Sequence, residues 1–129
     1  MILLGKIRRA RRKKEKKMEE ILARATEVVL ARRLYLNPNL RCAEVAKAIG
    51  TNRTYLWEAL GRHGFGFQDY LSKFRIRYFI EHAHQYKALQ CSEIAELCGF
   101  NGAKFLSKYL KQMFGISLAD YMKYICRGL

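Results

Sequence analysis

The sequence predicts an all-α fold of about seven helices, in which two helix-turn-helix units of the homeodomain-like type are joined by a long linker helix. Three observations predict this fold. Apolar residues recur at helical spacing, and no sustained strand-type alternation occurs. A phrase is repeated, as LRCAEVAKAIGTN at 40–52 and as LQCSEIAELCGFN at 89–101. In each copy a glycine separates a short helical segment from a longer one, which is the pattern of a helix-turn-helix.

The first helix is expected from about Lys16 to Leu34. Its apolar positions keep the spacing of one helix face: Met18, Ile21, Leu22, Ala25, Val28, Val29 and Leu36. Asn37-Pro38-Asn39 ends it, because the residue before a proline avoids helical backbone angles.

The first repeat predicts a short helix over 42–49 and a turn at Gly50, where glycine permits a positive φ. Asn52 is expected to cap a second helix over 53–62. The buried face of that helix is predicted to consist of Tyr55, Leu56 and Leu60.

The stretch 63–66 breaks the chain, and a long helix is expected over 68–86. The pattern then repeats, with helices over 92–98 and 103–113 on either side of Gly99. A last helix is expected over 118–127, after Gly115. Four segments follow from these elements: a basic segment 1–17, the first helix and first unit 18–66, the linker helix 67–86, and the second unit 87–129.

The linker helix, together with the widths of the helices at its ends, has about the length that two-groove binding requires. About 18 residues at about 1.5 Å each span about 27 Å. Successive major grooves lie about 34 Å apart along one side of a duplex. One chain is therefore expected to place two recognition helices in successive grooves, on an asymmetric site because the copies differ.

The net charge of +14 and a pI of about 9.9 indicate a polyanionic partner, either a nucleic acid or an anionic membrane surface. Much of this charge lies in KIRRARRKKEKK at 6–17. That run is interpreted as a solvated tail, as a non-specific DNA arm or as a juxtamembrane segment.

Several classes of site are not expected. The four cysteines form no CxxC pair, and the three histidines lie outside zinc spacings. The sequence has no nucleophile–base pair, phosphate loop or carboxylate dyad, so it predicts no enzyme, no metal and no cofactor. With no signal peptide, reduced cysteines and a cytoplasmic location are expected. The start, Met1 to Leu4, is too short to cross a bilayer but is compatible with the cytoplasmic part of a membrane-anchored regulator.

The second copy, IAELCGFNGAKFLSKYLKQMFGISLADY at 94–121, resembles the DNA-binding domain of AraC/XylS-type transcription regulators. The matching positions are Ile94-Ala95, Gly99-Phe100, Phe105-Leu106, Leu110-Lys111, Gly115 and Tyr121. The first copy is similar through Val45-Ala46, Gly50, Asn52, Tyr55-Leu56, Leu60 and Tyr70.

The resemblance covers about residues 36–127. It implies that the chain binds double-stranded DNA in a sequence-specific way, and it implies RNA polymerase as a further partner. It also leads us to expect an effector region or a membrane-anchored sensor region outside this chain.

The candidate DNA-binding residues of the second unit are Ala103, Lys104, Ser107, Lys108 and Lys111. Lysines are expected to reach guanine acceptors or phosphates, Ser107 a base or phosphate, and Ala103 a thymine methyl group. The alternative is that the lysines form an ordinary solvated helix face.

The candidate residues of the first unit are Arg53, Thr54, Trp57 and Glu58. Arg53 and Thr54 suit phosphate or guanine contacts. Trp57 is interpreted either as a core residue or as a DNA contact. Glu58 either accepts from a cytosine amine or balances Arg62, and the second interpretation is preferred.

The remaining polar and small residues have simpler interpretations. Arg75 and Arg77 are expected to meet the DNA backbone, and Asn52 and Asn101 to cap helices. Cys42, Cys91 and Cys98 are interpreted as small core residues, and His82 and His84 as surface residues.

Two alternative functions stay open. A non-specific architectural or RNA-binding basic protein has the same charge balance, and a pair of ordinary helical hairpins has the same periodicity.

Overall fold

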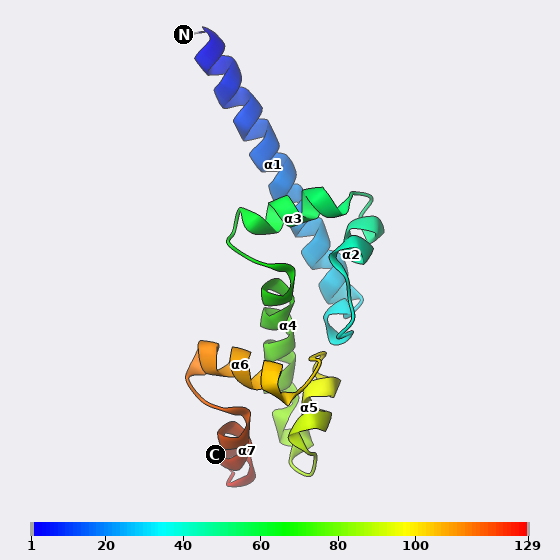
Figure 1. Cartoon of the computed structure of the whole chain (residues 1–129), viewed down its shortest axis with the longest axis vertical. Helices are drawn as coiled ribbons and strands as arrows, with labels where there is room; N and C mark the ends of the chain where they lie inside the picture. The colour runs from blue at the N-terminus through cyan, green and yellow to red at the C-terminus, as the bar shows by residue number, and fades with distance from the viewer. Residues whose placement is uncertain (1, 129) are drawn as a thin grey trace. The chain divides into compact units, whose positions relative to one another are not determined.

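The computed structural model describes residues 2–128, and every regular element in this part of the chain is helical (Figure 1). The prediction of an all-α chain with seven α-helices is confirmed for these residues. The elements are α1 (Ile2–Ala31), η1 (Leu34–Leu36), α2 (Cys42–Ala48), α3 (Arg53–Gly61), α4 (Phe67–His82), η2 (Ala83–Tyr86), α5 (Cys91–Leu97), α6 (Ala103–Phe114) and α7 (Leu118–Cys126).

Helix α1 begins at Ile2, far before the predicted start near Lys16. The basic run is helical because lysine, arginine, alanine and glutamate are all good helix formers and no proline interrupts them. The helix ends at Ala31, before the predicted Leu34, and Arg33 takes a left-handed φ of 51°. The element between that residue and Pro38 is the 3₁₀ turn η1.

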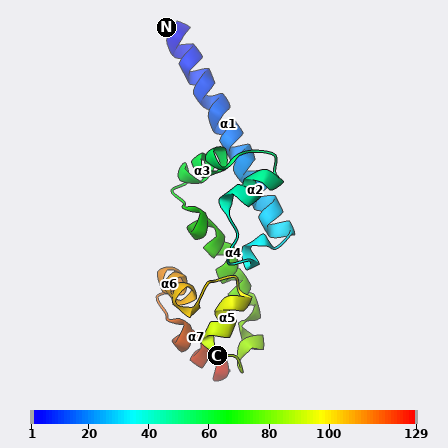
Figure 2. The ribbon, with the colours of Figure 1, turned by 45° about the vertical axis from the view of Figure 1, so that its right-hand side comes forward.

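The described chain forms two compact units, of which the first contains residues 2–33 and 41–67. In this unit α3 lies across α1, and α2 packs against both helices (Figures 1 and 2). The buried face of α1 repeats at helical spacing, which is why it covers both partners at once. The core of the unit includes Met18, Ile21, Ala25, Val29, Val45, Ala46, Leu56 and Leu60.

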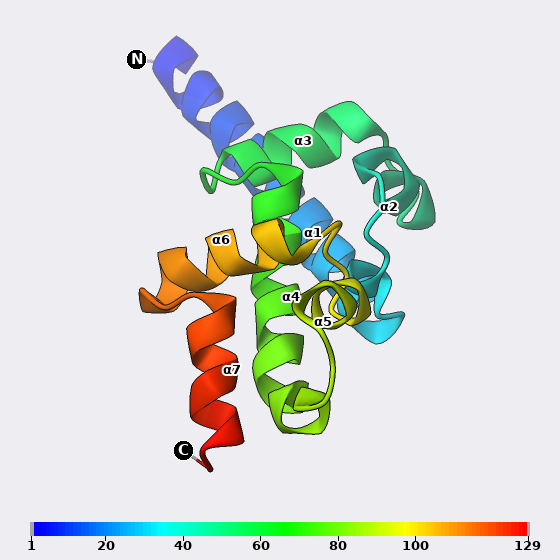
Figure 3. The ribbon, with the colours of Figure 1, turned by 60° about the horizontal axis from the view of Figure 1, so that its bottom comes forward.

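The second unit contains residues 34–40 and 68–128. Helix α6 crosses α4 and packs against α5 and α7 (Figure 3). The predicted linker helix is not uniform, since α4 ends at His82 and the tighter η2 turn follows. The buried core includes Phe79, Ile94, Ala95, Cys98, Phe100, Leu106, Leu110, Leu118 and Ile125.

The glycine turns of the two repeats have the predicted backbone. Gly50 has a φ of 75° and Gly99 a φ of 89°, which only glycine adopts without strain. Asn52 caps α3 as predicted, because its Oδ1 accepts from the Tyr55 N–H over 2.9 Å.

The expectation that Asn101 caps a helix is wrong. The N-cap position of α6 is Gly102, one residue later, and it makes no side-chain cap. Asn101 instead donates from Nδ2 to the carbonyl oxygen of Pro38 over 3.4 Å. The second turn is one residue longer than the first, since Gly50 to Leu56 is six positions and Gly99 to Leu106 is seven, and the additional residue displaces the asparagine from the capping position.

Three burial predictions also need correction. Tyr55 is exposed rather than buried, and the ammonium group of Lys17 in α1 lies 4.3 Å from the centre of its ring. Cys91 is only half-buried, at the start of α5. His82 is half-buried, since its ring stacks on Tyr78 at 4.0 Å between centroids.

The expectation that Arg75 meets the DNA backbone is wrong, whereas Arg77 is exposed. The Arg75 side chain is 3% exposed and donates to the carbonyl oxygens of Tyr35 and Asn37 and to the Gln68 amide oxygen. Burial lowers the pKa of its guanidinium to about 10, so it stays charged at neutral pH. Its charge is used to join the segment around η1 to α4.

Within residues 2–128, no helix is both long enough and apolar enough to cross a membrane.

Candidate nucleic-acid interface

Helix α6 separates an apolar face from a cationic face. Leu106 and Leu110 are fully buried, whereas Lys104, Lys108 and Lys111 are exposed. Residues at i, i+4 and i+7 lie on one side of a helix, so the three lysines form one surface opposite the two leucines. No acidic residue occurs in α6 to offset their charge. We call these three side chains the lysine face.

Ala103 and Ser107 lie at the edge of the lysine face rather than at its centre, and both are half-buried. The Ser107 hydroxyl oxygen accepts from the N–H of Leu118 over 3.4 Å, at the first residue of α7. Ser107 therefore helps to join α6 to α7, a role that its position in the sequence did not indicate.

The orientation of α6 is set by Tyr109, which was not among the predicted site residues. Its hydroxyl donates to Asp69 Oδ1 of α4 over 2.9 Å, and its ring stacks on Phe100 at 6.0 Å. Burial, followed by the hydrogen bond to Asp69, raises the pKa of Tyr109 to about 12. Lys108 Nζ lies 5.3 Å from the centre of the same ring, so a fixed aromatic side chain supports one lysine of the face.

Helix α3 presents Arg53, Thr54 and Trp57 to solvent on the side away from the buried Leu56 and Leu60. Trp57 is 52% exposed, which excludes the core interpretation of this residue. The Arg53 guanidinium lies 5.6 Å from its ring centre. A cation and a large flat apolar surface are thus side by side on one helix face.

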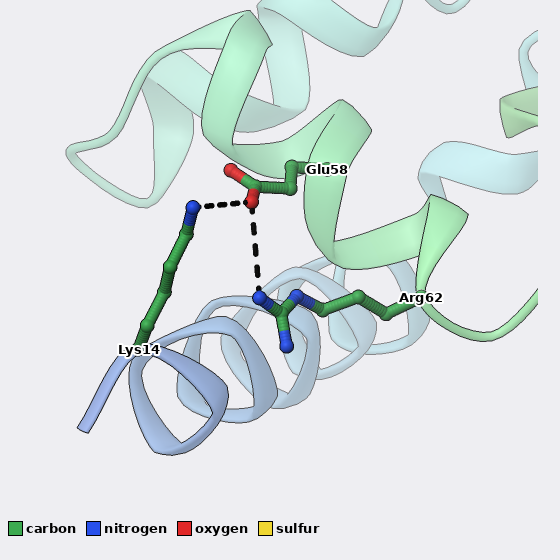
Figure 4. Close-up of polar contacts among 3 residues, drawn as sticks. All are labelled: Lys14, Glu58 and Arg62. Atoms are coloured by element: carbon green, nitrogen blue, oxygen red, sulfur yellow. Dashed lines mark ion pairs between the residues drawn. The ribbon is translucent and has the colours of Figure 1, made fainter. Parts of the chain in front are cut away.

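Glu58 is separate from that group and belongs to the contact between α3 and α1. Its carboxylate lies 2.9 Å from Lys14 Nζ and 3.8 Å from Arg62 Nη2 (Figure 4). The hydrogen bond from Lys14 is the largest cause that lowers the pKa of Glu58. The preferred interpretation, that Glu58 balances Arg62, is confirmed. The nearer partner Lys14 was missed because the basic run was not predicted to be helical.

Further cations of α1 lie near the start of α3. Lys17 and Arg24 line a shallow cleft with Thr51 and Asn52. Arg24 also donates to the carbonyl oxygen of Ile49, after the end of α2. Helix N-termini attract phosphate, so these two cations reinforce the positive potential at that end of α3.

Across 2–128, no three side chains of the His, Cys, Asp or Glu type gather where they would hold a metal ion. All four cysteines are free thiols. Burial raises the pKa of Cys98 to about 12, so this thiol is a packing residue rather than a nucleophile.

Comparisons of the chain with protein-family models, with curated proteins and with solved structures find no match.

Proposed function

We propose that this chain binds double-stranded DNA in a sequence-specific way, as the DNA-binding part of a transcription regulator. The observation that carries the proposal is the lysine face of α6. Three cations project from a helix whose opposite side is anchored by Leu106 and Leu110. A short helix and a positive-φ glycine precede it, which is the order of elements in a helix-turn-helix.

In this proposal α5, Gly99 and α6 form one helix-turn-helix, and α2, Gly50 and α3 form the other. A B-form major groove is about 12 Å wide and admits an α-helix. Lysines of α6 then reach guanine acceptors or phosphates, with Ser107 and Ala103 at the edge of the contact. The resemblance of residues 94–121 to AraC/XylS-type regulators supports the same partner.

The first unit is proposed to contribute Arg53, Thr54 and Trp57. An arginine suits a guanine edge or a phosphate, and the exposed indole suits a thymine methyl group. Glu58 is not assigned to a base, because Lys14 and Arg62 already neutralise it. Lys17 and Arg24 are assigned to the phosphate backbone, where they add affinity without sequence preference.

The two copies have different exposed residues, so the proposed target is not a palindrome. Recognition helices that enter successive grooves on one side of a duplex require half-sites about one helical turn, or about 10 base pairs, apart. A single chain then contacts both half-sites. Inserting about half a helical turn of DNA between the half-sites should prevent the two recognition helices from binding at the same time.

Selection of binding sites from random duplex DNA tests the proposal. We expect an enriched site with two unlike half-sites, bound roughly a thousand-fold or more tightly than a shuffled duplex of equal length. Both affinities should fall as salt rises, since cations displace counterions from the phosphates. Equal affinity for selected, shuffled and RNA duplexes at every salt concentration would instead identify a non-specific basic nucleic-acid binder.

A further inference from the structure

The first part of α1 stands clear of the unit to which it belongs. We call residues 2–13 the α1 extension. Lys14 of α1 forms an ion pair with Glu58 of α3, and the first buried residue of α1 is Met18. The extension projects past α3 as a bare helix (Figures 1 and 2). At about 1.5 Å per residue, its twelve positions span about 18 Å.

The tip of the extension is apolar and open to solvent. The exposed fractions are 78% for Ile2, 71% for Leu3, 54% for Leu4 and 44% for Ile7. Leu3, Leu4 and Ile7 lie on one side of the helix, because residues three and four apart are neighbours. Four adjoining large aliphatic side chains without cover are typical of an interaction site rather than of an ordinary surface.

The rest of the extension is cationic. Lys6 lies within the tip, before Ile7, and Arg8, Arg9, Arg11, Arg12 and Lys13 follow it; no acidic residue lies between Ile2 and Lys14. These cations point in several directions around the helix, because consecutive residues are about 100° apart. The extension thus has a mainly apolar tip that contains one lysine, and a cationic collar formed by the five basic residues that follow Ile7.

We propose that the α1 extension binds the surface of anionic phospholipid bilayers. The exposed aliphatic side chains of the tip enter the boundary between headgroups and acyl chains, as the apolar residues of interfacial helices do. The collar then lies at the level of the headgroups, where arginine and lysine keep their charge in water and pair with lipid phosphates.

An anionic bilayer is the partner that accounts for both parts of the extension. A nucleic-acid backbone would use the arginines but would leave the four aliphatic side chains in water. A neutral bilayer or an apolar protein groove would bind the tip but would offer no negative charge to the cations of the collar. The lipid proposal does not depend on DNA binding, because its residues lie outside the lysine face and outside α3.

Vesicle sedimentation with the full chain tests the proposal. The probes are phosphatidylcholine vesicles and vesicles with about a third of phosphatidylglycerol, and we expect at least about ten-fold stronger binding to the second. Leu3→Ser with Leu4→Ser should weaken binding to the anionic vesicles by more than about ten-fold. Arg8→Gln with Arg9→Gln should weaken it by roughly ten-fold or more, at about one kcal/mol per cation.

Leu30→Ser is the matched control, since Leu30 is an exposed leucine of the same helix outside the extension. It should leave vesicle binding unchanged, and Leu3→Ser with Leu4→Ser should leave DNA affinity unchanged. Absence of binding to anionic vesicles would overturn the proposal. So would binding that only the arginine substitutions weaken, because that is simple polyanion attraction. If the leucine variant loses both DNA affinity and vesicle binding, the tip is needed for folding, and this outcome would also overturn the proposal.

Discussion

Arg75 Nε donates a hydrogen bond to the carbonyl oxygen of Tyr35 over 2.6 Å, although the two residues are 40 positions apart. A second donor of the same guanidinium reaches the Asn37 carbonyl oxygen over 3.1 Å. The fork geometry of arginine serves several acceptors at once, and here it makes the segment 34–40 part of the second unit. A charged side chain of α4 therefore acts as a structural anchor.

Arg75→Met is expected to destabilise the second unit by about 2–4 kcal/mol, because buried carbonyl oxygens lose charged donors. Arg75→Lys should recover little of this, since a single ammonium group cannot reproduce the fork. Urea unfolding of both variants measures the effect. Arg77→Met is the matched control on the exposed side of α4 and should change stability by less than about 0.5 kcal/mol. Equal effects of the two methionine substitutions would contradict the anchor role.

The glycine turns of the two repeats differ in what surrounds them, and this predicts unequal mutants. A Cβ at Gly99 would lie 2.8 Å from the Leu36 Cα and closer still to the Tyr35 carbonyl oxygen. At Gly50 the nearest atom is the flexible end of Arg24, at 4.0 Å. Gly50→Ala should therefore cost only the left-handed backbone, about 1–2 kcal/mol.

Gly99→Ala should lower the free energy of unfolding by the same backbone contribution. It should lower it further because the added Cβ must displace the segment around Tyr35. We expect at least about 3 kcal/mol in total, read as a larger fall of the urea midpoint for Gly99→Ala than for Gly50→Ala. A midpoint shift of the same size in both variants would show that the close backbone approach at Gly99 has no energetic effect.

The sequence pattern was sufficient to predict the features that depend only on residues nearby in the chain. The spacing of Leu106 and Leu110 predicted the buried side of α6 and hence the position of its lysines. The turn at Gly50 and the cap at Asn52 depend only on nearby backbone, and both were predicted correctly.

Residues whose environment comes from distant segments could not be predicted in this way. Arg75 is buried because carbonyl oxygens 38 and 40 positions away need donors, and no local pattern encodes that need. Tyr55 contacts Lys17 and Glu58 pairs with Lys14 because the basic run is helical and continues α1 past α3. Tyr109 was missed because its partner Asp69 lies 40 positions earlier.

The pairing of Lys14 with Glu58 predicts a shifted titration. The pKa of Glu58 is held below its ordinary value of 4.5, with the Lys14 hydrogen bond as the largest cause. Lys14→Met should raise that pKa toward 4.5, measured by NMR titration of the Glu58 carboxyl carbon. Lys13→Met, one position away on the extension, is the control and should leave the Glu58 pKa nearly unchanged.

The same pair predicts the sign of the pH dependence. A carboxylate whose pKa is lower in the folded state contributes stability above its unfolded pKa, and this contribution is lost as the pH falls through the folded value. The unsubstituted chain should therefore lose stability on acidification below about pH 4.5 more steeply than Lys14→Met. Parallel acid profiles of the two proteins would contradict the pairing in solution.

Thiol reactivity should distinguish the four cysteines. Cys98 is fully buried with a pKa raised to about 12, whereas Cys126 is exposed near the end of α7. Only thiolates react with an aromatic disulfide reagent, so Cys126 should be labelled first and Cys98 only in urea, as read by peptide mass mapping. Early labelling of Cys98 without urea would show that the second unit opens readily around α5.

The lysine face makes the sharpest prediction for DNA binding. Lys108→Ala removes an exposed cation whose ammonium group lies 5.3 Å from the centre of the Tyr109 ring. Affinity for the selected site should fall by about 1–3 kcal/mol, roughly 5- to 150-fold, with a melting temperature within about 2 °C of the unsubstituted protein. Lys123→Ala, an exposed lysine of α7, is the matched control and should change affinity much less.

The way in which DNA affinity falls in Lys108→Ala identifies the group of the DNA that Lys108 contacts. If Lys108 binds a phosphate, affinity falls equally for selected and shuffled duplexes and the salt slope decreases by about one. If it binds a guanine edge, the loss is confined to the selected site and preference relaxes at one base pair. Unchanged affinity would remove Lys108 from the interface. A sharp fall in melting temperature would instead mean that the contact of Lys108 with the Tyr109 ring helps to hold α6 against α4. Lys104 and Lys111 would then be the remaining candidates for DNA contact in α6.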